Sequence, residues 1–271
     1  MERADFAAAL PYALGSAERG SGDGMKLLVT CYETQGKWDD AAVWVERLAE
    51  LDGGGLDWFF WCKRTGKGPL ARAQQAAEAT AQYNRKPDAR LDGELGVYHL
   101  VVGQPDKALP RFQRALELSL NPAQGLYAAL TAETLKNTAA RDAALEVAIK
   151  KGPQYESGNG GRRRPATVKL AAIFKEVFAK GPNGLLDTVA IDALAGGAPA
   201  DEATDIHYFT GWFLDQRGLK EEANGYYLRA AQGTKERLTH VLARDILRAR
   251  KIDAEQPPPK AIPTENVDLT F

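Results

Sequence analysis

Two segments of this 271-residue chain carry the same small and aromatic residues at the same spacing. The first is GVYHLVVGQPDKALPRFQRAL at residues 96–116, and the second is GWFLDQRGLKEEANGYYLRAA at residues 211–231. The shared positions are Gly96 and Gly211, Gly103 and Gly218, Ala108 and Ala223, Phe112 and Tyr227, and Ala115 and Ala230. A spacing used twice in one chain indicates a structural unit that is repeated.

The rest of the chain is patterned for helices. Apolar residues recur at helical spacing almost throughout, and the alternating runs typical of strands are absent. Glycine or proline interrupts this pattern at short intervals, from Gly20 to Gly233. Glycine ends helices because it enters the left-handed conformation at little cost, and proline suits the first turn of the next helix. The sequence therefore predicts about fourteen short α-helices joined by tight turns.

Several neighbouring helices pair across a turn in the same manner. Beside the two quoted segments, paired helices are predicted to turn at Gly36 and Gly66, near Asn137, and around Gly181. These units resemble the tetratricopeptide repeat, a helix-turn-helix unit of about 34 residues. The resemblance departs from the family pattern in two ways. The large aromatic residue that usually begins the first helix is absent, and the spacing between turn residues is irregular.

The shared residues have a packing role in this interpretation. A small residue midway along the first helix, Gly96 or Gly211, lets the second helix approach closely. Ala108 and Ala223 lie at the helix crossing, where a larger side chain would force the pair apart. Phe112 and Tyr227, the aromatic residues of the second helices, fill the gap toward the next unit.

We therefore expect an all-α fold, a right-handed superhelical solenoid of about six helix-turn-helix repeats plus a C-terminal capping helix. The solenoid is predicted over residues 1–250, with the weakest repeat register at 122–200 and insertions at 152–165 and 196–203. The N-terminal helix resembles the second half of a pair, which indicates either an N-terminal cap or excision from a longer array. Residues 251–271 are proline-rich, and we expect an extended or disordered tail.

Composition narrows the class of protein. With 35 Lys and Arg against 36 Asp and Glu, no net charge favours nucleic acid or acidic lipid. No apolar run is long enough for a membrane-spanning helix, and the N-terminus lacks the basic lead of a secretion signal. We expect a cytoplasmic protein without a membrane partner; a signal removed before Met1 is the alternative. Cys31 and Cys62 fit reduced core thiols.

The sequence offers little that points to catalysis. The three histidines, His99, His207 and His240, are not spaced with other ligands for a metal. RTGKGPL lacks the hydroxyl residue that follows the lysine of a phosphate loop, so a turn between paired helices is expected there. We expect no enzyme activity, no metal, no cofactor and no small-molecule substrate.

One basic run has two interpretations. Arg162, Arg163 and Arg164 follow a flexible glycine run and could contact phosphate, nucleic acid or an acidic peptide. No aromatic residues are interleaved with them, however, and the favoured interpretation is a solvated loop that leads into a helix.

The family resemblance also implies a site for a partner. In tetratricopeptide repeats, one face of each first helix lines a concave groove that holds extended peptides or partner helices. Projecting that face onto this chain selects Lys26, Thr30, Phe60, Lys63, Val97, Leu100, Tyr127, Thr131, Tyr208 and Trp212. Thr30 and Val97 stand where carboxylate-binding members of the family have asparagines. The set therefore favours hydrophobic recognition of another protein or peptide over capture of a C-terminal carboxylate.

The sequence thus predicts a non-catalytic interaction scaffold. The alternative is a regulatory or sensor domain of a larger enzyme or signalling complex, because repeat arrays often accompany such partners. A weaker alternative is nucleic-acid or anion binding through residues 162–164.

Overall fold

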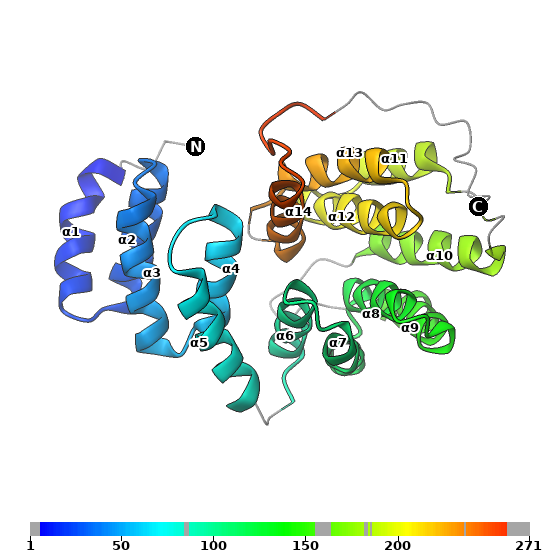
Figure 1. The fold of residues 1–271 in the computed structure, drawn as a ribbon, viewed down its shortest axis with the longest axis horizontal. Coiled ribbons are helices and arrows are strands. Elements are labelled where there is room, and N and C mark those ends of the chain that lie inside the picture. The colour runs from blue at the N-terminus through cyan, green and yellow to red at the C-terminus, as the bar shows by residue number, and fades with distance from the viewer. Residues whose placement is uncertain are drawn as a thin grey trace. The chain divides into compact units, whose positions relative to one another are not determined.

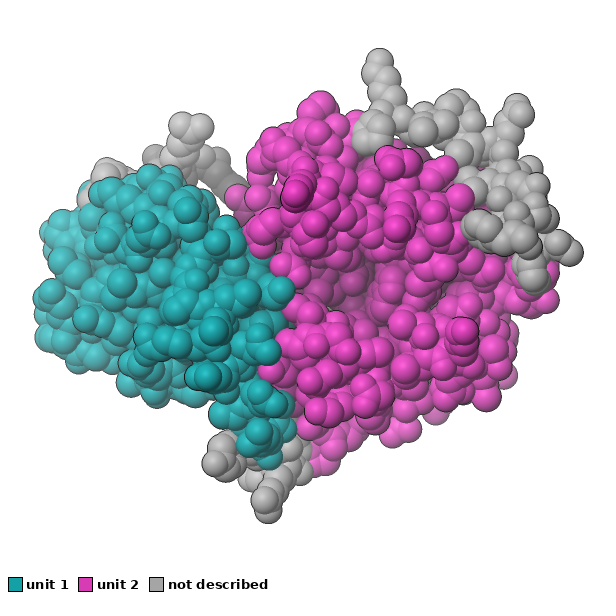
Figure 2. Space-filling model, viewed as in Figure 1, with its two compact units in different colours: residues 1–86 teal, residues 87–271 magenta. Residues whose placement is uncertain are grey.

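A computed structural model describes residues 6–83, 87–154, 164–181, 184, 186–235 and 237–258. These residues form fourteen α-helices and contain no β-strand, which confirms the predicted all-α class. The chain divides into two compact units, residues 1–86 and residues 87–271, coloured separately in Figure 2. In the described part of the chain, no helix is long and apolar enough to cross a membrane.

Unit 1 contains five helices that pack mainly on their neighbours in sequence (Figure 1). They are α1 (Phe6–Glu18), α2 (Gly22–Thr34), α3 (Trp38–Asp52), α4 (Gly55–Thr65) and α5 (Leu70–Tyr83). Leu28 and Trp44 belong to the core between α1, α2 and α3. Glu33 of α2 accepts hydrogen bonds from Trp61 Nε1 and Arg64 Nη2 of α4, both at 2.6 Å. This carboxylate ties one helix pair to the next.

Unit 2 contains nine helices and a short 3₁₀ turn at Gly152–Gln154 (Figure 1). Its helices are α6 (Ala89–Val101), α7 (Pro105–Ser119), α8 (Pro122–Thr134), α9 (Thr138–Lys151), α10 (Pro165–Ala179), α11 (Thr188–Gly196), α12 (Ala200–Gln216), α13 (Lys220–Ala231) and α14 (Leu238–Ala249). The expected insertion at 196–203 is absent, because only residues 197–199 separate α11 from α12. The other expected insertion, at 152–165, falls largely on residues outside the described ranges.

The predicted helix pairs that turn at Gly36, Gly66, Gly103, Gly218 and near Asn137 are present, and several of their turns share one geometry; the pair expected around Gly181 is not, because α10 packs mainly on α9 and α11 mainly on α12. Gly36, Gly103 and Gly218 all have positive φ, as expected for turn glycines. At each, the N–H donates to the carbonyl three residues earlier, and the following N–H donates to the carbonyl five residues before it. The same bonds form at Lys136 and Lys251, which adopt the left-handed conformation without being glycine. Such bonds satisfy the carbonyls left open at a helix end.

The close helix crossings confirm the packing role predicted for the small residues. A Cβ atom added at Gly96 of α6 would lie 2.5 Å from the ring of Phe112 in α7. At Gly211 of α12, it would lie 3.0 Å from the ring of Tyr227 in α13. Phe112 also stacks on Tyr127 of α8, at 4.9 Å between ring centroids and 9° between planes. The aromatic residue therefore fills the space toward the next pair, as expected.

Unit 2 also has contacts between helices far apart in sequence. Helix α8 packs directly on α12, α10 packs on both, and α14 packs on α12 and α13 and reaches α6. Gln216 Nε2 of α12 donates to the Leu130 carbonyl and to Thr134 Oγ1 of α8, at 2.8 and 2.6 Å. The first helices of several pairs therefore meet one another inside this unit.

The chain after α14 folds back on unit 2 as far as it is described. Arg244 Nη1 pairs with Glu255 Oε1 at 2.8 Å, and Gln232 Nε2 donates to the carbonyls of Ala254 and Gln256. Residues 259–271, the rest of the predicted tail, lie outside the described ranges.

Candidate functional site

The first helices α8 and α12 of unit 2 bring several of the predicted site residues together. Tyr127 of α8 lies beside Tyr208 and Trp212 of α12, with ring centroids 6.2 and 6.3 Å away. Tyr208 and Trp212 are 6.0 Å apart. The three rings, here called the aromatic triangle, are tilted by 45–56° to one another. They come from the set projected onto the groove, so the structure brings these three predicted residues together.

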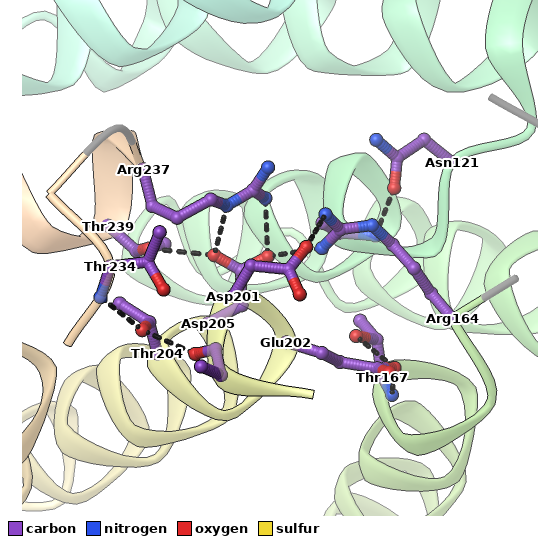
Figure 3. Close-up of polar contacts among 12 residues, drawn as sticks. Asn121, Arg164, Thr167, Asp201, Glu202, Thr204, Asp205, Thr234, Arg237 and Thr239 are labelled. Carbon is purple, nitrogen blue, oxygen red and sulfur yellow. Dashed lines mark hydrogen bonds and ion pairs between the residues drawn. The ribbon is translucent and has the colours of Figure 1, made fainter. Parts of the chain in front are cut away.

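A charged cluster lies at the N-terminal end of α12 (Figure 3). It consists of Arg164, Asp201, Glu202, Asp205 and Arg237. Asp205 Oδ2 accepts from Arg164 Nη1 and Arg237 Nη2, both at 2.5 Å. Asp205 Oδ1 accepts from Arg237 Nε at 3.2 Å and from Thr239 Oγ1 at 2.7 Å. Because Asp205 is fully buried, its negative charge depends on these four donors.

Glu202 completes the start of another helix. Its Oε1 accepts from the backbone N–H of Thr167 at 2.6 Å and from the Thr167 hydroxyl at 2.9 Å. Thr167 lies in the first turn of α10, where backbone N–H groups have no partner within the helix. Arg164, the residue before α10, supplies no side-chain cap itself, so a carboxylate of α12 takes this role.

Tyr127 links the two groups. Its hydroxyl is buried and has no hydrogen-bond partner among the described residues. Burial raises the pKa of Tyr127 well above its usual value; Tyr208 and Asp205 raise it further, and Arg237 and Arg164 lower it. Burial also raises the pKa of Tyr208, with a smaller contribution from Asp215. Both phenols therefore keep their protons at neutral pH and act as neutral hydrogen-bonding groups.

The other projected groove residues differ in accessibility. In unit 1, Lys26 and Thr30 are exposed on α2, Lys63 is half-buried on α4, and Phe60 is buried. In unit 2, Val97 and Thr131 are buried along with Tyr127 and Tyr208, whereas Leu100 and Trp212 are half-buried. Half of the set therefore belongs to the interior, and five members reach the surface: Lys26, Thr30, Lys63, Leu100 and Trp212.

Of the basic run, only Arg164 is described. Its side chain is buried and pairs with Asp205, and its Nη2 also lies 3.2 Å from Asp201 Oδ2. Arg164 is thus an interior residue and not part of a solvated loop, contrary to the favoured expectation. Arg162 and Arg163 lie outside the described residues.

Sequence reasoning missed the acidic half of the charged cluster. Asp201, Glu202 and Asp205 fall in the first turns of a helix, where acidic residues normally face water and favour the helix dipole. The burial of Asp205 depends on Arg164 and Arg237, which are 41 and 32 residues away, and the buried Glu202 depends on Thr167, which is 35 residues away. No local sequence pattern predicts partners so far away along the chain.

The cysteines and the RTGKGPL segment of the sequence lie in ordinary structural environments. Cys31 and Cys62 are unpaired and buried, as predicted, and burial, with a smaller effect of Glu46, raises the pKa of Cys62 to about 11. Among the described residues, no three His, Cys, Asp or Glu side chains are grouped to hold a metal ion. Residues 66–69 of RTGKGPL form the turn between α4 and α5, as expected.

No family model and no curated protein matches this sequence.

Proposed function

We propose that this chain is a non-catalytic interaction module, built from tetratricopeptide-like hairpins that continue as a right-handed solenoid. The partner is another protein, held as a peptide or helix against the first helices. The repeated crossing supports the repeat assignment: Gly96 against Phe112, Gly125 against Ala148, and Gly211 against Tyr227. Each places a side-chain-free position of a first helix against its second helix.

The aromatic triangle carries the proposed partner site. Tyr127 and Tyr208 form its buried base, and Trp212 is its half-buried edge. Rigid aromatic side chains supply large contact area at low entropic cost, which is why they dominate protein interfaces. Leu100 of α6 is a second half-buried apolar residue in the projected set. We propose that Trp212 and Leu100 contact the partner in unit 2, and that Lys26, Thr30 and Lys63 do so in unit 1.

A displayed library of random short peptides, selected on the full chain, tests this proposal. Calorimetry on a selected peptide then compares the wild type with Trp212→Ala and Leu100→Ala. We expect each substitution to weaken binding by about tenfold or more, as for interface anchors. Leu118→Ala is the matched control, because Leu118 is an exposed apolar residue on the second helix α7.

The helix content of each variant, measured by circular dichroism, separates lost binding from lost folding. If selection yields no peptide, or if the selected peptides bind folded Trp212→Ala and Leu100→Ala as tightly as the wild type, the proposed site is wrong.

A further inference from the structure

Five buried polar atoms on α8 and α12 have no hydrogen-bond partner among the described residues. They are Gln124 Oε1, Tyr127 Oη, Glu202 Oε2, Thr210 Oγ1 and Gln216 Oε1. Gln124 and Tyr127 are three residues apart and share a side of α8, whereas Glu202 and Gln216 lie near opposite ends of α12, about 21 Å apart along its axis. A buried polar atom without a partner costs about 1–3 kcal/mol, and natural proteins keep few of them.

The chemistry of these atoms defines what would satisfy them. A carboxylate oxygen and two amide oxygens can only accept hydrogen bonds, whereas the phenol of Tyr127 and the hydroxyl of Thr210 can accept as well as donate. Gln216 is held at the far end of α12, where its Nε2 donates to the Leu130 carbonyl and to Thr134 Oγ1, so it does not share one small ligand with Glu202. The complementary group must therefore be a hydrogen-bond donor.

The charge and the aromatic rings of the junction indicate the chemical class of the donor. The charged cluster holds three carboxylates, Asp201, Glu202 and Asp205, against the two guanidinium groups of Arg164 and Arg237. Its formal charge is therefore −1. Tyr127 of the aromatic triangle feels the charges of Asp205, Arg237 and Arg164, which shift the pKa of its phenol, and the faces of Trp and Tyr rings attract cations. Excess negative charge, unsatisfied acceptors and aromatic faces together favour a cationic donor.

We propose that the α8–α12 junction, formed by the aromatic triangle and the charged cluster, binds a primary ammonium group. An ammonium group is compact and carries three donors and no acceptor, which suits a site whose open atoms accept. Its source is the lysine side chain of a partner peptide or a free aliphatic amine, and the peptide source rests on the proposed function. Asp201 and Gln124 are half-buried, so both the start of α12 and the start of α8 reach the surface. Figure 2 shows the viewed face of unit 2 hollowed near its centre.

Calorimetry with the full chain tests the site with defined probes. The probes are 1,5-diaminopentane, a lysine-containing peptide, and the same peptide with its lysine acetylated. Glu202→Gln is the diagnostic variant, because it keeps an oxygen for Thr167 but replaces the open acceptor by an amide donor. We expect at least about tenfold weaker binding of the amine, the usual effect of losing a hydrogen bond to a charged group.

Two further variants keep the test decisive. Glu221→Gln, at an exposed site on α13, makes the same chemical change outside the junction and should bind like the wild type. If Glu202→Gln does not fold, Tyr127→Phe removes one buried hydroxyl while keeping the ring, and it should also weaken amine binding.

The possible outcomes distinguish a free amine from a peptide lysine, and they distinguish the ammonium site from the proposed peptide-binding function. Binding of both probes, or of the diamine alone, that is lost in Glu202→Gln supports the site and shows whether the amine is free or peptide-borne. Absence of amine binding at millimolar concentration, or equal binding by Glu202→Gln, overturns it. A peptide that binds equally well after lysine acetylation rules out the peptide source and, where the diamine does not bind either, overturns the ammonium site, yet it leaves the proposed peptide-binding function standing.

Discussion

The hairpins α6–α7 and α12–α13 cross in the same way but are anchored differently. In the first, buried Asp92 of α6 pairs with Arg111 and Arg114 of its own second helix. In the second, His207 occupies the position of Asp92, four residues before the crossing glycine. Arg229, which corresponds to Arg114, pairs instead with Asp192 of α11.

Other polar contacts of α12–α13 also leave the hairpin. Asp205 binds Arg164 and Arg237, and Asp215 pairs with Arg250 at the end of α14. Gln216 donates to α8. The apolar crossing therefore forms a hairpin in both places. The polar residues around the crossing bond either within the hairpin, as in α6–α7, or to other helices, as in α12–α13. The hairpin α12–α13 is therefore the hub of unit 2, the hairpin that connects several other helices through polar contacts.

Replacement of the two buried aspartates should show the largest difference between the hairpins. Asp205→Ala leaves Arg164 and Arg237 without their shared carboxylate, and we expect the free energy of unfolding to fall by about 3–5 kcal/mol. Asp92→Ala should lower the free energy of unfolding less, by about 1–3 kcal/mol, because Arg111 and Arg114 are partly exposed and water can solvate their guanidinium groups. Urea unfolding measures both values.

The exposed Glu117→Ala on α7 is the control for that comparison and should change stability by less than about 0.5 kcal/mol. An equal loss from Asp92→Ala and Asp205→Ala would contradict the hub role of α12.

His207 should give the hub hairpin a pH dependence. Burial, reinforced by the charge of Arg229 and opposed by Asp192, lowers the pKa of His207 to about 4. In the unfolded chain the pKa is about 6.5, so the unfolded state binds a proton first as the pH falls. This contribution to stability is complete above about pH 6.5 and is lost between about pH 6.5 and pH 4, by roughly 3 kcal/mol.

Urea unfolding at about pH 7 and about pH 4 checks this expectation by comparing the wild type with His207→Gln. The variant should lose less stability on acidification. His99, whose pKa is lowered chiefly by burial, acts in the same direction and is unchanged in both proteins. A wild type and variant with identical pH dependence would show that His207 titrates normally in the folded protein.

The crossing glycines should differ in their tolerance of a methyl group. In Gly96→Ala the new Cβ meets the Phe112 ring at 2.5 Å, and Phe112 is fully buried and stacked on Tyr127. We expect a loss of about 1–3 kcal/mol, typical of overpacking. In Gly211→Ala the nearest ring atoms lie at 3.0 Å, and the gain of about 1 kcal/mol in helix propensity offsets much of the strain.

Thermal unfolding of the two variants ranks them. A larger loss for Gly211→Ala than for Gly96→Ala would mean that the second crossing is the tighter one, contrary to the distances.

The fold was predictable from the sequence wherever its determinants are local. Glycine and proline spacing indicates the helix ends, and the residues of each crossing lie within one hairpin, as Gly96 and Phe112 do. Lys136 in the left-handed conformation shows a limit of this reasoning, because a turn can recur where the usual glycine is replaced.

The site was only partly predictable, since it depends on contacts between distant helices. The projection selected Tyr127, Tyr208 and Trp212, which do lie together, but it assumed an open groove. Because α8 packs directly on α12, Tyr127 and Tyr208 become interior residues. Asp205 was not selected, because acidic residues at a helix start carry no sign of burial.

The bonds from Gln216 to α8 have a consequence for the order in which unit 2 assembles. They connect positions 82 and 86 residues apart, whereas Asp92 and Arg114 are separated by only 22. Closing a longer loop costs more chain entropy, and contacts between distant residues slow folding. We therefore expect the hairpins to form early and the α8–α12 junction to close late. The proposed ammonium site would then be among the last parts of the molecule to exist during folding, and among the first to open.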